Sequence, residues 1–195
     1  MIDFQYPDGT TPLDPDEAEG LLLTHITTRG ELDRWEQDNI SEALSWLESR
    51  KPNDILTQEF MRTLHRRMFG NVWTWAGKFR QSDKNIGSPW WRISEDLKNL
   101  CNDVKLWIEN HTFSPDEIAI RFHHRLVHTH PFPNGNGRHG RLMADLLIEE
   151  TLDGRRFSWG GADLSGKSSS RERYIIALRA ADELDYGPLL EFARS

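Results

Sequence analysis

Apolar residues recur at helical spacing along most of this chain, and prolines and glycines separate one run from the next. Between Glu31 and Lys51 the apolar side chains follow one another every three to five residues, which places them on one face of a helix. Pro52 then ends the run, because proline disfavours continuing a helix. The same pattern predicts further helices that start near Asp54, Ser94, Ser114, Arg138, Arg171 and Pro188.

The stretch from Val72 to Trp91 is the exception to this helical pattern. It is rich in aromatic residues, and Gly87 and Pro89 interrupt helical periodicity in its second half. We predict a short β-hairpin or protruding loop there, and we name residues 81–91 the flap. The predicted fold class is therefore all-α, a helical domain with a short β-hairpin flap.

The first 30 residues differ in composition from the rest of the chain. They are rich in Pro, Asp, Gly and Thr and show little periodicity, so we predict that residues 1–30 form an extended arm packed on the domain. Residues 31–195 are predicted to form that domain, because a chain of 195 residues is of the usual size for one.

Composition excludes several classes of protein. Cys101 is the only cysteine, so no internal disulfide can form, and no apolar run is long enough to span a bilayer. The net charge of −7 argues against a general nucleic-acid binder but leaves room for a local basic pocket. The first residues lack a signal-peptide pattern, and we expect a cytoplasmic protein without a membrane or nucleic-acid partner.

The segment from His130 to Arg141 carries the strongest chemical pattern, a glycine-rich loop between two predicted helices. Gly135 and Gly137 permit positive φ, so successive backbone N–H groups can point to one side, beside the N-terminus of the next helix. Arg138 and Arg141 lie three residues apart and can reach the same polyanion. The pattern predicts a triphosphate site.

His130, at the end of the preceding helix, can accept a proton from a hydroxyl group, because imidazole titrates near neutral pH. Asn136 offers an amide donor and a carbonyl acceptor, which suits either an α-phosphate oxygen or the loop itself. Together these residues predict phosphoryl or nucleotidyl transfer, in which the protein supplies positioning and charge.

Residues 130–141 resemble the signature of the Fic (filamentation induced by cAMP) family, His-x-Phe-x-acid-Gly-Asn-Gly-Arg-x-x-Arg. Within that family the chain is most similar to the branch called mobile mystery protein B. The resemblance implies a protein adenylyltransferase that transfers AMP from ATP, with Mg²⁺ or Mn²⁺, to a Ser, Thr or Tyr hydroxyl of a target protein. A Doc-like protein phosphotransferase and a catalytically weak nucleotide-binding interaction protein are the alternatives.

The resemblance also implies roles for individual residues: His130 as general base, Phe132 as loop anchor, Gly135, Asn136 and Gly137 as anion nest, and Arg138 and Arg141 on the outer phosphates. The flap residues Lys84, Asn85, Ile86 and Gly87 would hold the target by strand-like backbone pairing. Asn134 stands where the family usually has an acid for magnesium, and a neutral oxygen binds a hard cation more weakly than a carboxylate does.

Many Fic proteins carry an inhibitory glutamate that pairs with the first arginine of the motif. Thr27 and Glu31 fit the first part of that pattern, but Leu32 does not, so Glu31 is a candidate regulator. An acid in the first turn of a helix is also favoured by the helix dipole alone. An antitoxin-like regulatory partner is a further possibility, and the sequence does not predict the oligomeric state.

Two other patterns have ordinary explanations. His124 and His128 lie four residues apart, as in helical metal sites, but no glutamate lies between them as in zinc hydrolases. We favour solvent-facing or core roles for them and for His123. Core and flap packing, rather than nucleic-acid stacking, is predicted for four tryptophans, namely Trp73, Trp75, Trp90 and Trp91.

Overall fold

The computed structural model describes residues 14–50, 52, 54–161 and 169–195. Within these residues all regular structure is helical, and β-structure is limited to one isolated bridge between Leu21 and Trp73. The helices are α1 (Pro15–Ala18), α2 (Arg29–Arg50), α3 (Gln58–Phe69), η1 (Trp90–Arg92), α4 (Ile93–Glu109), α5 (Pro115–Thr129), α6 (Asn136–Glu150), η2 (Trp159–Gly161), α7 (Ser169–Asp182) and α8 (Gly187–Arg194).

The helix starts follow local capping chemistry. Ser114 accepts a hydrogen bond from Glu117 N and Pro115 occupies the first turn of α5, as predicted. Helix α3 begins three to four residues later than predicted, because Thr57, and not Asp54, caps it by accepting from Phe60 N. Ser94 does not cap α4, since η1 leads directly into that helix.

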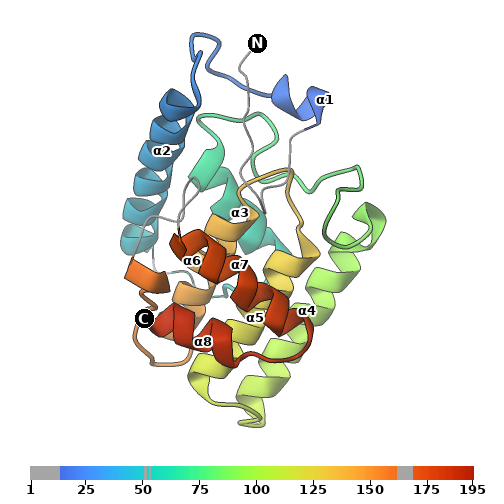
Figure 1. Cartoon of the computed structure of the whole chain (residues 1–195), viewed down its shortest axis with the longest axis vertical. Coiled ribbons are helices and arrows are strands. Elements are labelled where there is room, and N and C mark those ends of the chain that lie inside the picture. Colours follow the sequence, from blue (N-terminus) through green and yellow to red (C-terminus); the bar gives the residue numbers. More distant parts are fainter. Residues whose placement is uncertain (1–13, 51, 53, 162–168) are drawn as a thin grey trace.

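Helices α5 and α6 lie side by side in the middle of the fold (Figure 1). The α2–α3 pair covers one side, α4 packs on α5, and α7 with α8 crosses the front. Phe122 and Leu126 on α5, and Met143 and Leu147 on α6, are almost completely buried between these helices. Each such side chain contributes roughly 1.5–3 kcal/mol of stabilisation, so the two helix ends that flank residues 130–135 are firmly positioned.

The predicted β-hairpin is absent from the described residues: residues 78–89 form bends and turns without strands. The reason is Arg80, whose guanidinium binds the carbonyl oxygens of Ser82 and Ser88 near the two ends of this loop. A hairpin would need backbone groups of this kind for pairing across its strands. The flap is therefore a loop closed by one buried side chain.

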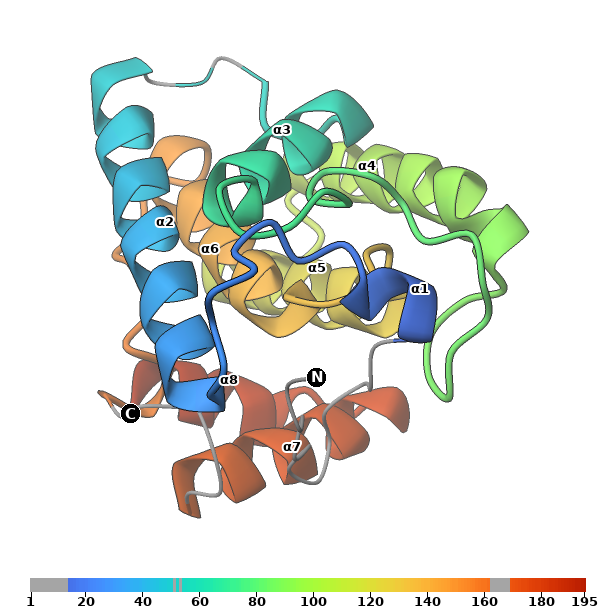
Figure 2. The same ribbon diagram turned by 90° about the horizontal axis from the view of Figure 1, so that it is seen from above.

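The described part of the N-terminal arm packs on the domain. Thr74 N donates to Gly20 O and Leu22 N donates to Val72 O, each at 2.9 Å. Helix α1 lies at the same end of the molecule as the loop that joins α5 to α6 (Figure 2). Residues 1–13 of the predicted arm lie outside the described residues, and α2 begins at Arg29, two residues before the predicted start.

No helix among the described residues has the length and apolar character that a bilayer crossing requires.

Candidate anion-binding and catalytic site

The loop between α5 and α6 begins and ends in left-handed backbone conformation. His130 has φ of 51° and ends α5, and Gly135 has φ of 78° and precedes α6. A Cβ at Gly135 would lie 2.7 Å from the Phe69 ring, so glycine is needed for both conformation and space. A non-glycine residue with positive φ is uncommon, and such backbone strain is concentrated at functional positions.

Asn136 closes the loop from inside. Its Oδ1 accepts from Phe132 N at 3.0 Å, and its Nδ2 donates to Phe132 O at 2.8 Å. Both residues are buried, and the Phe132 ring stacks on His65 with centroids 3.7 Å apart. Of the two roles predicted for Asn136, the structure has the one in which it holds the loop, and Phe132 is the predicted anchor.

His65, on α3, is a residue of this site that the sequence analysis did not identify, and it is fully buried. Its Nδ1 accepts from Gly77 N, so Nε2 carries the proton and donates to Asn134 O at 3.0 Å. Burial, above all, holds the pKa of His65 well below its usual value, so the ring is neutral and ties the loop to the chain before the flap.

Arg138 has a carboxylate partner from outside the motif. Its Nη1 lies 2.6 Å from Oε2 of Glu36 on α2, and the other carboxylate oxygen accepts from the Trp73 indole at 2.7 Å. Glu36 is only 4% exposed. A signal for it exists in the sequence: the buried residues of α2 include Glu36 and Asn39 at the spacing of the apolar positions, so polar side chains occupy core positions there.

Glu31, the residue predicted to pair with Arg138, is instead an exposed cap of α2. Its Oε2 accepts from the backbone N–H groups of Thr27 and Thr28, each at 3.0 Å. These bonds satisfy donors at the helix N-terminus, which is the ordinary explanation given above. The structure thus assigns the arginine contact to Glu36 and not to Glu31.

A cluster of arginines surrounds the start of α6. Arg141 lies over the Tyr174 ring, 5.5 Å from its centroid. Arg171 has a pKa below its ordinary value because of burial and because positive charges on Arg141, Arg29 and Arg138 act on it. On a chain of net charge −7, this concentration of positive charge favours a bound polyanion.

His130 lies under the flap. It is 7% exposed, and neither ring nitrogen has a hydrogen-bond partner within the described part of the chain. A Cβ at Gly87 would lie only 2.7 Å from the His130 Cβ, so the flap backbone packs closely against this residue. Burial and then the charges of Arg80 and Lys84 lower the pKa of His130 to about 3, so the imidazole is neutral and able to accept a proton.

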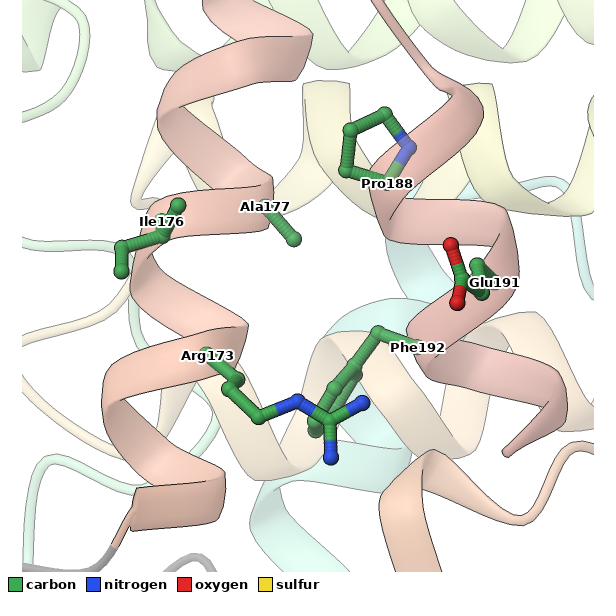
Figure 3. A pocket seen from close by; sticks show the side chains of 6 residues that line it. All are labelled: Arg173, Ile176, Ala177, Pro188, Glu191 and Phe192. Carbon is green, nitrogen blue, oxygen red and sulfur yellow. The ribbon is translucent and has the colours of Figure 1, made fainter.

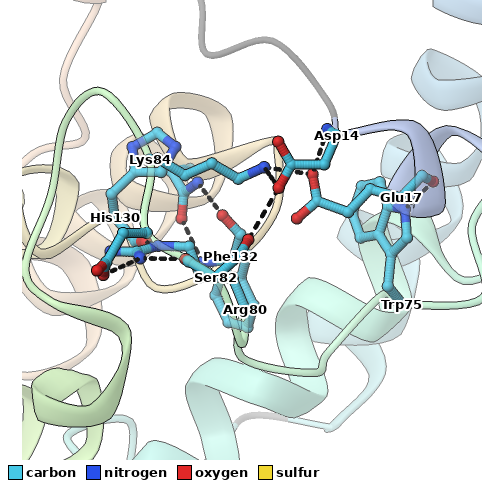
Figure 4. Close-up of polar contacts among 10 residues, drawn as sticks. Asp14, Glu17, Trp75, Arg80, Ser82, Lys84, His130 and Phe132 are labelled. Atoms are coloured by element: carbon cyan, nitrogen blue, oxygen red, sulfur yellow. Dashed lines mark hydrogen bonds and ion pairs between the residues drawn. The ribbon is translucent and has the colours of Figure 1, made fainter.

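Arg80 connects the flap to His130. Its side chain is almost fully buried and donates from Nε to His130 O at 2.7 Å, while its other nitrogens bind Ser82 O and Ser88 O (Figure 4). The backbone of the catalytic candidate and both ends of the flap therefore share one guanidinium. The sequence offered no motif for this contact.

Lys84 is paired with carboxylates of the N-terminal arm. Its ammonium group contacts Asp14 at 2.8 Å and also Glu17, and its side chain is only 3% exposed (Figure 4). We call this set of three residues the arm clasp. Asn85, Ile86 and Gly87 are exposed, so of the predicted target-binding segment only these three residues present side chains or Cα atoms to solvent.

The residues of the loop do not fit a magnesium ion held by the protein. Asn134 is a neutral carboxamide, and its Oδ1 already accepts from Gly135 N at 2.6 Å. Its carbonyl oxygen is bound by His65. Hard divalent cations prefer carboxylate and phosphate oxygens, and residues 130–137 contain no acid.

His139 and His123 are held inside the fold by polar contacts. His139 is buried, and its ring contacts Met61 O at 3.0 Å. His123 is buried against the Tyr174 hydroxyl at 2.8 Å.

A depression of about 240 Å³ between α7 and α8 contains none of the motif residues; its lining consists of Arg173, Ile176, Ala177, Pro188, Glu191 and Phe192 (Figure 3).

Comparison with known proteins gives one family. The Fic/DOC family model matches residues 55–148. The protein adenylyltransferase Fic of Aedes aegypti is 31% identical over 144 residues, which are 72% of this chain and 27% of that protein, and the protein of the same name from Culex quinquefasciatus is 28% identical over the same shares. The chain thus spans about a quarter of the length of these curated relatives.

Solved structures share the fold at lower identity. A Fic-1 fragment from C. elegans has a TM-score of 0.67 at 23% identity, covering 91% of this chain and 51% of that one. The BepC protein of Bartonella tribocorum, solved with AMPPNP bound, has a TM-score of 0.65 at 18% identity, covering 93% of this chain and 97% of that one.

Proposed function

Because the chain belongs to the Fic/DOC family, we propose that it is a protein adenylyltransferase, which transfers AMP from ATP to a hydroxyl side chain of a target protein. The main support for this proposal is the position of His130. Its imidazole is neutral and buried, and it lies directly before the loop and the N-terminus of α6, where several arginines are close together. A base beside a polyanion site is the arrangement that nucleotidyl transfer to a hydroxyl requires.

In this proposal His130 accepts the proton of a Ser, Thr or Tyr hydroxyl. The hydroxyl oxygen forms a bond to the α-phosphorus of ATP, the bond from that phosphorus to the α–β bridging oxygen breaks, and pyrophosphate leaves. A phosphate group close to His130 favours the imidazolium form, so the pKa of His130 is expected to rise from about 3 when nucleotide binds.

Arg138 and Arg141, with the backbone N–H groups at the start of α6, would hold the outer phosphates. Arg138 is already paired with Glu36, so a triphosphate must compete with that carboxylate. Asn136 holds the loop through its two hydrogen bonds with the Phe132 backbone. We therefore expect ATP to bind more weakly than the number of positive charges suggests.

Mg²⁺ or Mn²⁺ would arrive with ATP, whose phosphates supply the anionic ligands that Asn134 lacks. Such an ion neutralises phosphate charge when bound, and no step above depends on it.

The exposed residues Asn85, Ile86 and Gly87 would offer backbone groups to a target segment. For this the flap must move off His130. A cytoplasmic location and an antitoxin-like regulatory partner, which could act on the arm clasp or on Glu36, belong to the same proposal.

The test is labelling of a cell extract by the purified chain with ATP and Mg²⁺ or Mn²⁺. ATP labelled on the α-phosphate should give bands that disappear with His130→Ala and persist with His25→Ala, a change at an exposed position. Loss of roughly a hundredfold or more is expected for His130→Ala. Mass spectrometry of a labelled band should show added AMP.

Two results would reject the proposal. Bands labelled only from the γ-phosphate, with the mass of a phosphate, would identify a Doc-like phosphotransferase. ATP binding by calorimetry without any His130-dependent labelling would identify a nucleotide-binding protein without catalysis.

A further inference from the structure

A second group of ligand-type side chains lies near the C-terminal end of α5, outside the anion site. His124 Nε2 lies 2.8 Å from Asp182 Oδ1, and His128 Nδ1 lies 3.2 Å from the same oxygen. Asp182 is the last residue of α7, so the group joins two helices through residues 54 and 58 positions apart in the chain. Two imidazoles and one carboxylate thus converge on one point.

We propose that His124, His128 and Asp182 form a binding site for a borderline divalent transition ion of the Zn²⁺ class. Histidines at positions i and i+4 of a helix present their rings on the same face, which is a standard arrangement for zinc. Two imidazole nitrogens favour Zn²⁺, Co²⁺ or Ni²⁺ over Mg²⁺ and Ca²⁺, which prefer oxygen ligands. The sequence lacked a third ligand between the histidines, and α7 supplies it.

The distances are close to those that a bound ion needs. One ligand atom from each residue lies within 4.8 Å of the others. In a tetrahedral zinc site, ligands at about 2.0–2.2 Å from the metal are roughly 3.3 Å from one another. The His128 side chain is 63% exposed and can rotate to close the remaining gap, and the exposed side of the group leaves the fourth position to water.

His124 is the fixed ligand of the three. Its side chain is 9% exposed, and its ring meets the Tyr186 ring edge-on at 5.5 Å. Its Nδ1 is buried and without a hydrogen-bond partner among the described residues. When a metal binds Nε2, the ring proton lies on this Nδ1, which has no hydrogen-bond acceptor among the described residues. Because the outer hydrogen bond that usually supports a metal-bound histidine is missing, we expect micromolar affinity and not that of a structural zinc finger.

A charged neighbour of the group is Arg125, whose guanidinium is paired with Asp103 at 2.7 Å. Because Arg125 has this partner, it does not compete with a metal ion for the Asp182 carboxylate. Since His128 is two residues before His130, a bound ion would fasten α7 to the last turn of α5 next to the catalytic candidate. This proposal does not depend on adenylyl transfer, because none of its ligands belongs to the anion loop.

The test is titration of the EDTA-treated, dialysed chain of residues 1–195 with Zn²⁺ by calorimetry, and with Co²⁺ by visible absorption. We expect one Zn²⁺ per chain at micromolar affinity and the intense visible bands of tetrahedral Co²⁺. His128→Ala and Asp182→Asn should each weaken binding by at least about tenfold. His25→Ala, at an exposed histidine elsewhere, should bind as the unchanged chain does.

His130→Ala separates this proposal from the proposed function, since that variant should lose labelling and keep the metal. His128→Ala removes an exposed side chain and is expected to fold, and circular dichroism checks that it does. Absence of Zn²⁺ binding below millimolar concentration would overturn the proposal and leave a hydrogen-bonded group only. Equal binding by the chain and by both ligand variants would overturn it as well.

Discussion

The loop at residues 130–136 and the flap meet at His130, but they are held in different ways. The loop is closed by a neutral side chain close in sequence, since Asn136 binds both backbone groups of Phe132. The flap is held by charged groups and by distant partners: Lys84 reaches residues of the arm 67 or more positions away, and Arg80 reaches His130.

This difference indicates which of the two regions can open more easily. A buried neutral network has no charge to titrate away, whereas a buried cation keeps its place only while its acceptors stay. The loop is therefore the rigid part of the candidate site, and the flap with its arm is the part that substitutions or partners can open. The predictions below test this contrast, beginning with the largest effect.

Acid should destabilise the chain through the buried imidazoles on and beside the loop. Burial lowers the pKa of His123 and His130 to about 3 and of His139 to about 4. Below about pH 6.5 these imidazoles become protonated in the unfolded chain but stay neutral in the folded chain. The free energy of unfolding therefore falls by about 1.4 kcal/mol for each ring per unit decrease in pH. Asp145 acts oppositely, because burial raises its pKa to about 6 and the folded state gains a proton there.

Urea unfolding at pH 6.5, 5.5 and 4.5 measures this slope. Three such imidazoles against one carboxyl group give an expected net loss on the order of several kcal/mol over this range, and His65, whose pKa burial also lowers, adds to the loss. His139→Gln should reduce the slope by about one imidazole, and His111→Gln, at an exposed position, should leave it unchanged. A flat profile would show that these rings are protonated in the folded chain.

Arg80→Met should give the next largest effect and should act on the flap. The thioether keeps the volume but removes the donors to His130 O, Ser82 O and Ser88 O, which would stay buried without partners. We expect the unfolding free energy to fall by about 3–5 kcal/mol.

The matched control is Arg92→Met, since Arg92 forms an exposed ion pair with Asp96 at 3.2 Å. That change should cost less than about 1 kcal/mol. Chemical denaturation of both variants gives the comparison, and hydrogen exchange at residues 81–88 shows whether the flap opens. Equal stability of the two variants would mean that Arg80 does not hold the flap.

The loop could be predicted from the sequence because its determinants are local. A left-handed Gly135, a serine cap before Pro115 and helical periodicity all act within a few residues, and the structure has each of them as expected. The positive φ predicted for Gly137 is wrong, because Gly137 lies in the first turn of α6 with helical backbone. The all-α fold follows from the same short-range rules. The predicted start of α3 failed because Thr57, and not Asp54, caps that helix, and Ser94 does not cap α4 because η1 leads directly into it.

The partners of the flap could not be predicted, because they depend on which distant side chains the fold brings together. Nothing in the sequence near Lys84 indicates Asp14, and nothing near Arg138 indicates Glu36, 102 residues away. The hairpin prediction failed for the same reason, since it counted local turn residues and not a buried guanidinium. Only the polar residues at core positions of α2 could have directed attention to Glu36.

Glu36→Gln should show whether an ion pair holds Arg138 in place, as ion pairs with the arm hold the flap. Glutamine can still accept from the Trp73 indole, but its amide group faces Arg138 with a donor instead of an acceptor. Arg138 is then free to bind phosphate, and we expect the affinity for a non-hydrolysable ATP analogue to rise about tenfold, or 1.4 kcal/mol.

Calorimetry measures this change, with Glu42→Gln as the control on an exposed position of the same helix. Unchanged affinity in Glu36→Gln would mean that Arg138 takes no part in binding the nucleotide, and it would remove the main support for the anion site.

Glu31→Ala should have the smallest effect, and it separates two glutamates that lie on one helix within five residues. Backbone hydrogen bonds from Thr27 and then Thr28 hold the pKa of Glu31 below its ordinary value. Its stabilising contribution is therefore present above the pKa of the unfolded chain and is lost as the pH falls through the lowered value. We expect a slightly lower Tm at pH 7 that converges with the unchanged chain in acid, and no change in nucleotide affinity or labelling. A gain in nucleotide affinity like that expected for Glu36→Gln would instead mean that Glu31 leaves its cap and reaches Arg138.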